Sequence, residues 1–202
     1  MQIFGDSRST NTRKVLTTLA ELDAPYELVH VDFALGMHKQ EPHLSRQPFG
    51  QMPALEDDGF VLYESHAMCR YLNDRAAGQL MPRELRARAV ADQWMSIESA
   101  NFSTHAMKFV YHHLLRVAQD PAALEHAGAT LDKTLRILAA QLSRHSFVAG
   151  QTFTLADICF MPYFWYMMLT PANDLITRHA SVLAWWDKVR KRPSWQSVAA
   201  HT

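Results

Sequence analysis

Hydroxyl side chains gather near the N-terminus, at the start of a predicted helix. Ser7, Ser9 and Thr10 follow a short apolar run and precede apolar residues at helical spacing. Serine and threonine are common helix N-caps, and the first turn of a helix favours negative charge. A hydroxyl in this place can donate a hydrogen bond to an anionic atom of a ligand. Ser9 is therefore the first candidate for chemistry, with Ser7 and Thr10 as alternatives.

A second polar cluster consists of Gln51-Met52-Pro53 and Glu64-Ser65, again next to a strand-to-helix junction. Ligands of α/β layers collect at such junctions, because the N–H groups of a helix start can donate hydrogen bonds to anions and carboxylates. Together, the two clusters suit a ligand that has carboxylates and a peptide-like backbone.

The sequence lacks the residue patterns of a metal site, a serine-hydrolase site and a phosphate-binding loop. The chain has eleven histidines, but adjacent His112 and His113 cannot point the same way on a helix. His38 and His43 have no partnering array of cysteines or carboxylates at metal-ligand spacing, so no metal is expected. The seven glycines are scattered, which leaves neither a G-x-S-x-G nucleophile elbow nor a glycine-rich phosphate cradle.

The composition is that of a soluble globular protein. Of 202 residues, 48% are hydrophobic, and 20 basic residues balance 20 acidic ones. A net charge of zero argues against nucleic acid or an anionic membrane as a partner, since both attract clustered Lys and Arg. We find no secretion signal and no apolar run as long as a membrane helix. Cys69 and Cys159 lack C-x-x-C spacing, which disfavours a dithiol site and fits a reducing cytoplasm.

The spacing of apolar residues predicts the strands and helices that must position the two clusters. Alternating and helical patterns predict a β-α-β unit, then a hairpin around Asp57-Asp58-Gly59, then a helix that opens at Ser65. The predicted strands are 2–4, 26–31, 54–55 and 60–63, and the first helix is 9–22. From about residue 84 onward the pattern is helical, with predicted helices at 87–117, 121–144, 154–169 and 181–192. We therefore expect an α/β domain at 1–77, a linker at 78–84 and an all-α domain at 85–202.

Two start signals support the helical part. Pro121 after Asp120 is a favoured helix start, and Thr154 with Asp157 has the spacing of a capping box. Asp157 is therefore interpreted as a structural residue.

Several motifs resemble those of a known family. They are the run 11–21, His38-Lys39, the stretch Pro48-Phe-Gly-Gln-Met-Pro-Ala-Leu55, Leu62-Tyr-Glu-Ser65 and, near the C-terminus, the runs 153–157 and 184–194. The whole chain resembles a cytosolic glutathione S-transferase, most closely the serine-type phi class of plants and its bacterial relatives. The resemblance implies a thioredoxin-like domain that binds glutathione, followed by a helical domain.

The same resemblance assigns roles to individual residues. The Met52 backbone would pair with the cysteinyl part of glutathione, and Pro53 would be cis. Gln51, Glu64 and Ser65 would hold the γ-glutamyl end of the tripeptide.

At the other end of the tripeptide, His38 and Lys39 would face the glycine carboxylate. Ser9 would be the catalytic hydroxyl that stabilises the thiolate, and Asn11 would cap the helix or orient Ser9. Glutathione is thus expected as co-substrate, without a metal, and the second substrate as a small apolar electrophile. The resemblance also implies a homodimer.

Seven residues are candidates for the electrophile pocket, because methionine and aromatic side chains adapt to varied apolar ligands. They are His105, Met107, Lys108, Tyr111, Phe164, Trp165 and Met168. Interior packing is the alternative role for each of them.

Two rival functions stay open. One is a glutathione-dependent isomerase or reductase of the same fold, although the serine-serine-cysteine run of such isomerases is replaced here by Ser9-Thr10-Asn11. The other is a non-enzymatic binding module, which would be expected to lose the glutathione cluster that this sequence retains. Fold alone does not separate these possibilities.

Overall fold

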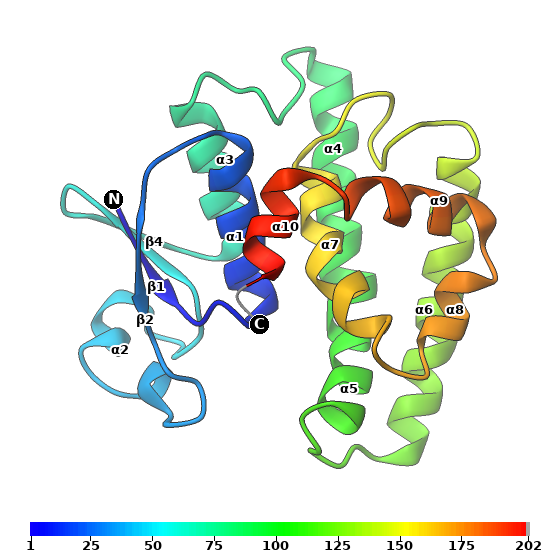
Figure 1. The fold of residues 1–202 in the computed structure, drawn as a ribbon, viewed down its shortest axis with the longest axis horizontal. Coiled ribbons are helices and arrows are strands. Elements are labelled where there is room, and N and C mark those ends of the chain that lie inside the picture. The colour runs from blue at the N-terminus through cyan, green and yellow to red at the C-terminus, as the bar shows by residue number, and fades with distance from the viewer. Residues whose placement is uncertain (201–202) are drawn as a thin grey trace. The chain divides into compact units, whose positions relative to one another are not determined.

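The computed structural model describes residues 1–200, which divide into two compact units. The first unit comprises residues 1–81 together with the segment from Arg192 onward, and the second comprises Pro82–Lys191 (Figure 1). The boundary after Met81 falls inside the predicted linker 78–84.

The described part of the first unit is built on a four-stranded sheet with the order β2-β1-β3-β4. Its strands are β1 (Gln2–Gly5), β2 (Glu27–His30), β3 (Ala54–Asp57) and β4 (Phe60–Tyr63). β1 is parallel to β2 and antiparallel to β3, and β3 is antiparallel to β4. The predicted β-α-β unit and hairpin are confirmed. Since β1 and β4 consequently run in the same direction, the helices that follow them begin at the same edge of the sheet.

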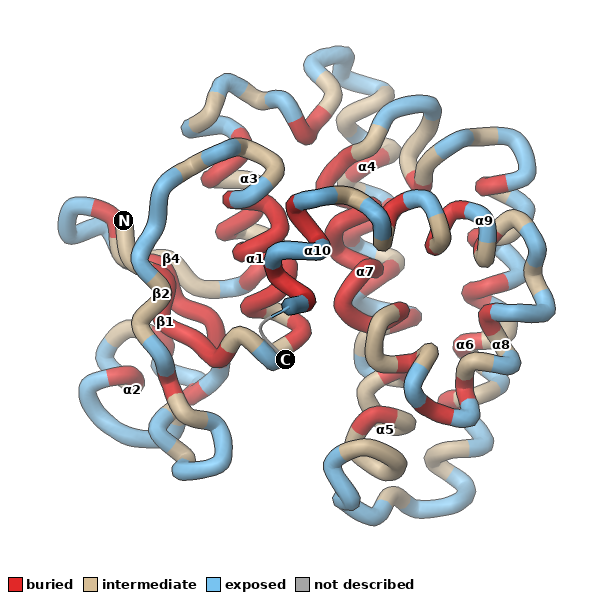
Figure 2. The backbone as a smooth tube through the Cα atoms, in the orientation of Figure 1, coloured by how far each residue is buried: buried red, intermediate tan, exposed pale blue. Residues whose placement is uncertain are grey.

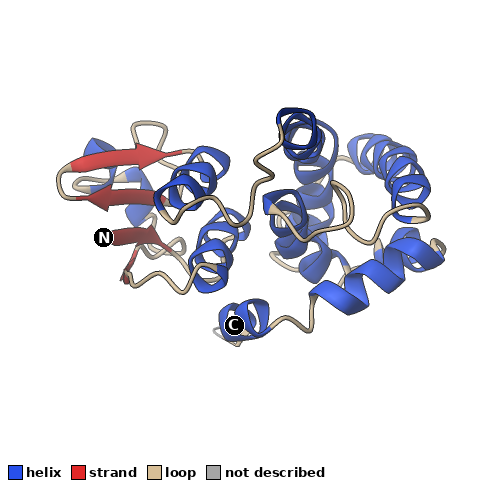
Figure 3. Cartoon of the chain, turned by 90° about the horizontal axis from the view of Figure 1, so that it is seen from above, coloured by secondary structure: helices blue, strands red, loops and turns tan. Residues whose placement is uncertain are grey.

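Those two helices are α1 (Thr10–Glu21) and α3 (Ser65–Arg75), which pack against each other beside the sheet (Figure 3). Val15 and Leu19 of α1 and Met68 of α3 are fully buried, as their helical spacing requires. In the sheet, the paired residues Ile3 and Leu55 are fully buried as well. The α1 tube is accordingly buried along most of its length in Figure 2.

Two short helical segments lie between the predicted strands 26–31 and 54–55, where the sequence pattern predicts no regular element. They are η1 (Met37–Lys39) and α2 (His43–Arg46), between β2 and β3. Each spans a single turn or little more, which is too short for apolar periodicity to reveal.

The regular elements of the described residues 82–191 are all helical (Figure 3). They are α4 (Leu85–Glu98), η2 (Ser99–Ser103), α5 (Thr104–His113), α6 (Pro121–Leu142), α7 (Leu155–Met167), α8 (Asn173–Thr177) and α9 (Ala180–Val189). The prediction of one helix at 87–117 differs from the structure, because the π-helical η2 separates α4 from α5. A π turn inserts an extra residue, and here it carries the fully buried Phe102. No helix of the described residues is both long and apolar enough to cross a membrane.

The core of the second unit surrounds α7, nearly every residue of which is buried (Figure 2). The Phe102 ring stacks on Phe164 at a centroid distance of 5.4 Å, and Trp185 meets Phe164 edge-on at 5.0 Å. Thr154 and Asp157 form the predicted capping box at the start of α7. The structural interpretation of Asp157 is therefore confirmed.

The end of the chain departs from the predicted domain boundaries. We expected the helical domain to run to residue 202, but the segment from Arg192 onward groups with the first unit. This segment forms α10 (Pro193–Ala199), which packs on α1. The physical reason is an ion pair, since the Arg192 guanidinium donates two hydrogen bonds of 2.6 Å to the Glu21 carboxylate on α1.

Candidate active site

Ser9 is the N-cap of α1, as its sequence position predicts. Its backbone is extended, with φ −67° and ψ 130°, and its hydroxyl oxygen accepts the Thr12 N–H at 3.4 Å. Because this bond uses an oxygen lone pair, the O–H proton can be donated to a ligand. Thr10 is already inside the helix and is buried, and Ser7 lies earlier in the turn. Ser9 is thus the one of these three hydroxyl residues that caps α1.

The turn that presents Ser9 is held by Asp6, which the sequence analysis missed. The Asp6 carboxylate accepts the Arg8 backbone N–H at 2.8 Å and two guanidinium N–H groups at 3.0 and 2.7 Å. The Ser9 N–H in turn donates to the Asp6 carbonyl at 2.9 Å. Burial opposes ionisation of Asp6, but the hydrogen bonds from Arg8 outweigh it and hold the pKa of Asp6 below its usual value. The carboxylate thus remains charged near neutral pH and keeps the turn closed.

Ser65 brings the second cluster next to the first. It is the first residue of α3, and its hydroxyl donates to the Asn11 side-chain oxygen on α1 at 3.3 Å. The two helix starts therefore converge, and the positive ends of their dipoles favour an anionic group at this place. Just before Ser65, Glu64 has φ +71°, which is a strained conformation for a residue other than glycine.

The segment Gln51–Pro53 lies before β3. The Met52–Pro53 peptide bond is cis, as the family resemblance implied. The Met52 side chain is buried, and its sulfur accepts the Asp6 N–H at 3.2 Å. The Gln51 carbonyl accepts a hydrogen bond of 2.6 Å from Nε2 of buried His43. Sequence reasoning found no role for His43, which anchors this segment.

His38 and Lys39 lie in η1. The Lys39 ammonium donates to the Phe49 carbonyl at 3.1 Å, and the His38 ring stacks on Phe33 at 4.6 Å. Burial, followed by the charges of Lys39 and His43, holds the pKa of His38 below its usual value, so His38 is mainly neutral at pH 7. Gly50 is required here, because a Cβ at this position would lie 2.7 Å from the Lys39 side chain.

The candidate pocket residues of the second unit fall into two groups. His105, Met107, Lys108 and Tyr111 on α5 are half-buried, as are Trp165 and Met168 at the end of α7. Phe164 instead has no exposed surface and belongs to the aromatic core. Its ring contacts leave no room for a ligand, so we assign it a packing role.

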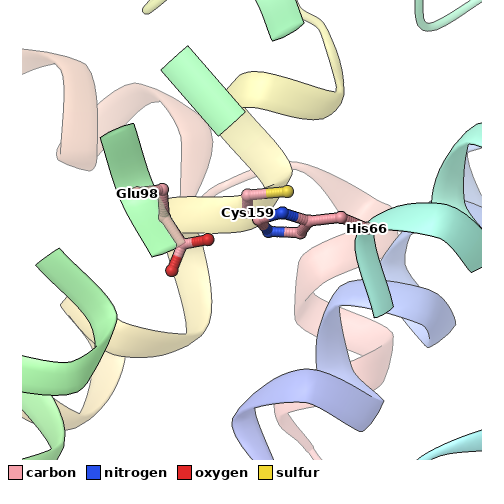
Figure 4. A group of neighbouring side chains, drawn as sticks. All are labelled: His66, Glu98 and Cys159. Carbon is pink, nitrogen blue, oxygen red and sulfur yellow. The ribbon is translucent and has the colours of Figure 1, made fainter. Parts of the chain in front are cut away.

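Titratable groups also meet inside the second unit. Burial, then His126 and Lys108, lower the pKa of His105, whose ring lies 5.9 Å from that of His126. Glu98 on α4 and Cys159 on α7 are fully buried neighbours, with a carboxylate oxygen and the sulfur within 4.8 Å (Figure 4).

Comparisons with known proteins match both units. Residues 1–74 match the family model "Glutathione S-transferase, N-terminal domain", and residues 94–193 match "Glutathione S-transferase, C-terminal domain". A probable glutathione S-transferase GSTF1 of rice is 34% identical, with 99% of this chain and 95% of the rice protein covered. The crystal structure of glutathione transferase F7 from Populus trichocarpa superposes with a TM-score of 0.93 at 34% identity, covering 99% and 98% of the two chains. Maize glutathione S-transferase I, solved with an atrazine glutathione conjugate, has a TM-score of 0.90 at 30% identity, covering 99% and 96%.

Proposed function

The chain belongs to the glutathione S-transferase family, and from this premise we propose that it joins the sulfur of glutathione to small apolar electrophiles, with Ser9 stabilising the thiolate. The observation that carries the proposal is the Ser9 hydroxyl at the start of α1, next to the converging start of α3. The maize structure holds an atrazine glutathione conjugate, which supports conjugation of glutathione to a small organic molecule as the reaction.

Ionisation of the thiol is the first step. A free thiol with a pKa of about 8.5 is only about 3% thiolate at pH 7, and the thiolate is the nucleophile. A hydrogen bond to a charged acceptor contributes roughly 1.5 to 3 kcal/mol, and a helix N-terminus adds about 0.3 to 1. Since one pKa unit corresponds to about 1.4 kcal/mol, the bound thiol becomes mostly ionised at neutral pH. Its proton leaves to solvent, while Ser9 keeps its own proton and donates a hydrogen bond.

The thiolate then attacks the electrophilic carbon. A sulfur–carbon bond forms from the sulfur lone pair, and either a leaving group departs with its bonding electrons or an unsaturated acceptor takes the electron pair and is protonated. Holding the two reactants together supplies much of the acceleration. The half-buried residues His105, Met107, Lys108 and Tyr111 of α5, with Trp165 and Met168, are the proposed lining for the electrophile.

Glutathione is positioned by the residues of the second cluster and of η1. We place its γ-glutamyl carboxylate at the N–H and hydroxyl of Ser65 and its ammonium at Glu64 and Gln51. The Met52 backbone pairs with the cysteinyl unit, and His38 and Lys39 face the glycine carboxylate. The first of these assignments is supported by the start of α3, which no side chain of the described residues caps and whose positive dipole end favours a carboxylate.

Replacing Ser65 by alanine is expected to raise the Kd for glutathione about tenfold, because a hydrogen bond to a charged group contributes roughly 1.5 kcal/mol or more. Isothermal titration calorimetry measures this change. Ser45→Ala is the matched control, since the Ser45 hydroxyl donates to the carbonyl of Pro42, the residue that precedes its own short helix. Undiminished affinity in Ser65→Ala would remove Ser65 from the site.

A panel of electrophiles assayed with glutathione tests the function as a whole. We expect conjugation of at least one apolar aryl halide or unsaturated carbonyl compound, detected as loss of free thiol and as a product of the summed mass. Tight glutathione binding with no turnover of any electrophile would favour a binding module instead.

We also propose that two copies of the chain pair as a cytoplasmic homodimer. Phe49 is 66% exposed on the first unit, while the second unit has a cavity of about 600 Å³ with a mixed lining, in which the apolar Val90, Trp94 and Ile137 lie beside Gln93, Gln141, Arg144 and His145. An exposed aromatic anchor and the apolar part of a cavity on one chain can pair reciprocally across a two-fold axis. Phe49 of each protomer would then fill the cavity of its partner.

Phe49→Ser is expected to raise the Kd of this dimer about a hundredfold or more, since burying a phenylalanine contributes about 1.5 to 3 kcal/mol at each of two symmetric sites. Light scattering after size-exclusion chromatography gives the mass. Leu35→Ser, at a 71% exposed position of the same unit, is the control and is expected to leave the mass unchanged. A monomeric wild-type protein, or a Phe49→Ser variant that dimerises normally, contradicts the proposal.

A further inference from the structure

Arg13 is a fully buried cation on α1 that contacts the turn carrying Ser9. Its Nε donates a hydrogen bond of 2.9 Å to the Ser7 carbonyl, and its backbone N–H donates one of 2.9 Å to the Ser9 carbonyl. A single residue thus contacts the backbone on both sides of Arg8. Asp6 holds the start of this turn through its hydrogen bonds with Arg8, and Arg13 holds the Ser7 and Ser9 carbonyls.

The C-terminal helix α10 covers this arginine. The Trp195 ring is fully buried, and the Arg13 guanidinium carbon lies 6.0 Å from its centroid. At the far end of α1, Glu21 accepts the two hydrogen bonds from Arg192 and a further one from the Ser194 hydroxyl. Figure 1 shows α10 beside α1, although the two are separated by most of the sequence. Burial and the paired carboxylate together fix α10 against the helix that begins at Ser9.

We propose that Arg13 is a positioning residue for the Ser9 hydroxyl and that α10 holds Arg13 in place. The inference rests on the proposed role of Ser9 and deepens it. Planar guanidinium groups form hydrogen bonds with fixed direction, and burial under Trp195 removes the competing water. The hydrogen bond from Arg13 fixes the position of the Ser7 carbonyl. It therefore also fixes the backbone that leads into Ser9, the N-cap of α1. Small displacements of an activating group have large effects on rate, about a hundredfold for 1 Å.

The test compares Arg13→Met, which removes the donors, with Arg13→Lys, which keeps a charged N–H donor. For folded Arg13→Met, we expect the thiol of bound glutathione to have a pKa about one unit higher and kcat to fall about tenfold. KM for glutathione should stay within about twofold, because Ser65 and Met52 are untouched. Arg13→Lys should recover part of both losses. The thiolate absorbance in the ultraviolet, titrated against pH, gives the pKa.

A purely structural role gives a different result. Folded Arg13→Met would then have a lower melting temperature with the wild-type thiol pKa and kcat, and this outcome would overturn the proposal. Should Arg13→Met not accumulate as folded protein, Arg192→Gln replaces it, because the Arg192 side chain is a third exposed and tolerates exchange better. The raised thiol pKa is expected there too, and a wild-type value would overturn the proposal.

Failure of this inference can be distinguished from failure of the proposed function. If wild-type protein does not lower the thiol pKa at all, the role of Ser9 fails. If the lowered pKa depends on Ser9 but is unchanged in the folded Arg13 and Arg192 variants, only the positioning role fails. Ser197→Ala on α10 is the control, since its hydroxyl donates to the Ser194 carbonyl within the same helix.

Discussion

Ser9→Ala is expected to raise the pKa of the bound glutathione thiol by about 1 to 2 units and to lower the conjugation rate at pH 7 about tenfold. The reason is that alanine donates no hydrogen bond, so the thiolate falls from most of the bound thiol to a minor fraction, while the start of α1 still favours it slightly over the free thiol. Ultraviolet titration of the binary complex measures the pKa, and steady-state kinetics measures the rate.

Three variants make this experiment specific to Ser9. Ser9→Thr keeps a hydroxyl and is expected to retain part of the activity, whereas Ser7→Ala and Thr10→Val remove the alternative hydroxyls and should leave the thiol pKa unchanged. Loss of the N-cap costs about 1 kcal/mol of stability, so the rate is referred to folded protein. An unaltered thiol pKa in Ser9→Ala would show that Ser9 is not the activating group.

Asp157→Asn is expected to lower the free energy of unfolding by about 3 kcal/mol or more. The buried carboxylate accepts the N–H groups of Val148 at 3.0 Å and Thr154 at 2.9 Å and the indole N–H of Trp185 at 2.8 Å. An asparagine has one acceptor oxygen, and its NH₂ group would face one of these donors. Urea denaturation measures the loss. Asp187→Asn, which removes an exposed ion pair with Arg190, should cost less than about 1 kcal/mol.

The same aspartate makes stability depend on pH. Burial raises the pKa of Asp157 to about 6, although hydrogen bonds from Val148, Thr154 and Trp185 oppose the increase. Between about pH 4 and 6 the unfolded chain has lost this proton while the folded chain retains it. The contribution of Asp157 to stability is therefore fully present at low pH, falls as pH rises, by up to about 1.4 kcal/mol per unit, and is level above pH 6.

Asp157→Asn lacks this slope, so the difference in unfolding free energy between wild type and variant should shrink from pH 4 to pH 6. Urea denaturation at several pH values gives both curves. If the curves run parallel over this range, Asp157 does not titrate as its burial indicates.

The sequence by itself determined the features that are encoded locally. Apolar periodicity gave the sheet and the long helices, and cap chemistry gave Ser9 at the start of α1 and the pair Thr154 and Asp157 at the start of α7. A cap depends on residues within one turn, which is why these assignments could be made from spacing alone. The family motifs added the cis bond before Pro53, for which local residue types give only a weak preference.

Only the tertiary structure decided which distant residues meet. The Ser65 hydroxyl reaches Asn11 across 54 positions, and Arg192 reaches Glu21 across 171. Such contacts depend on how helices pack against the sheet and against each other, and side-chain type does not specify the partner. For the same reason periodicity could not separate Phe164, which is fully buried in the core, from the half-buried residues proposed for the pocket. Spacing assigns a residue to a face of a helix, and packing decides whether that face meets a neighbouring element or a ligand.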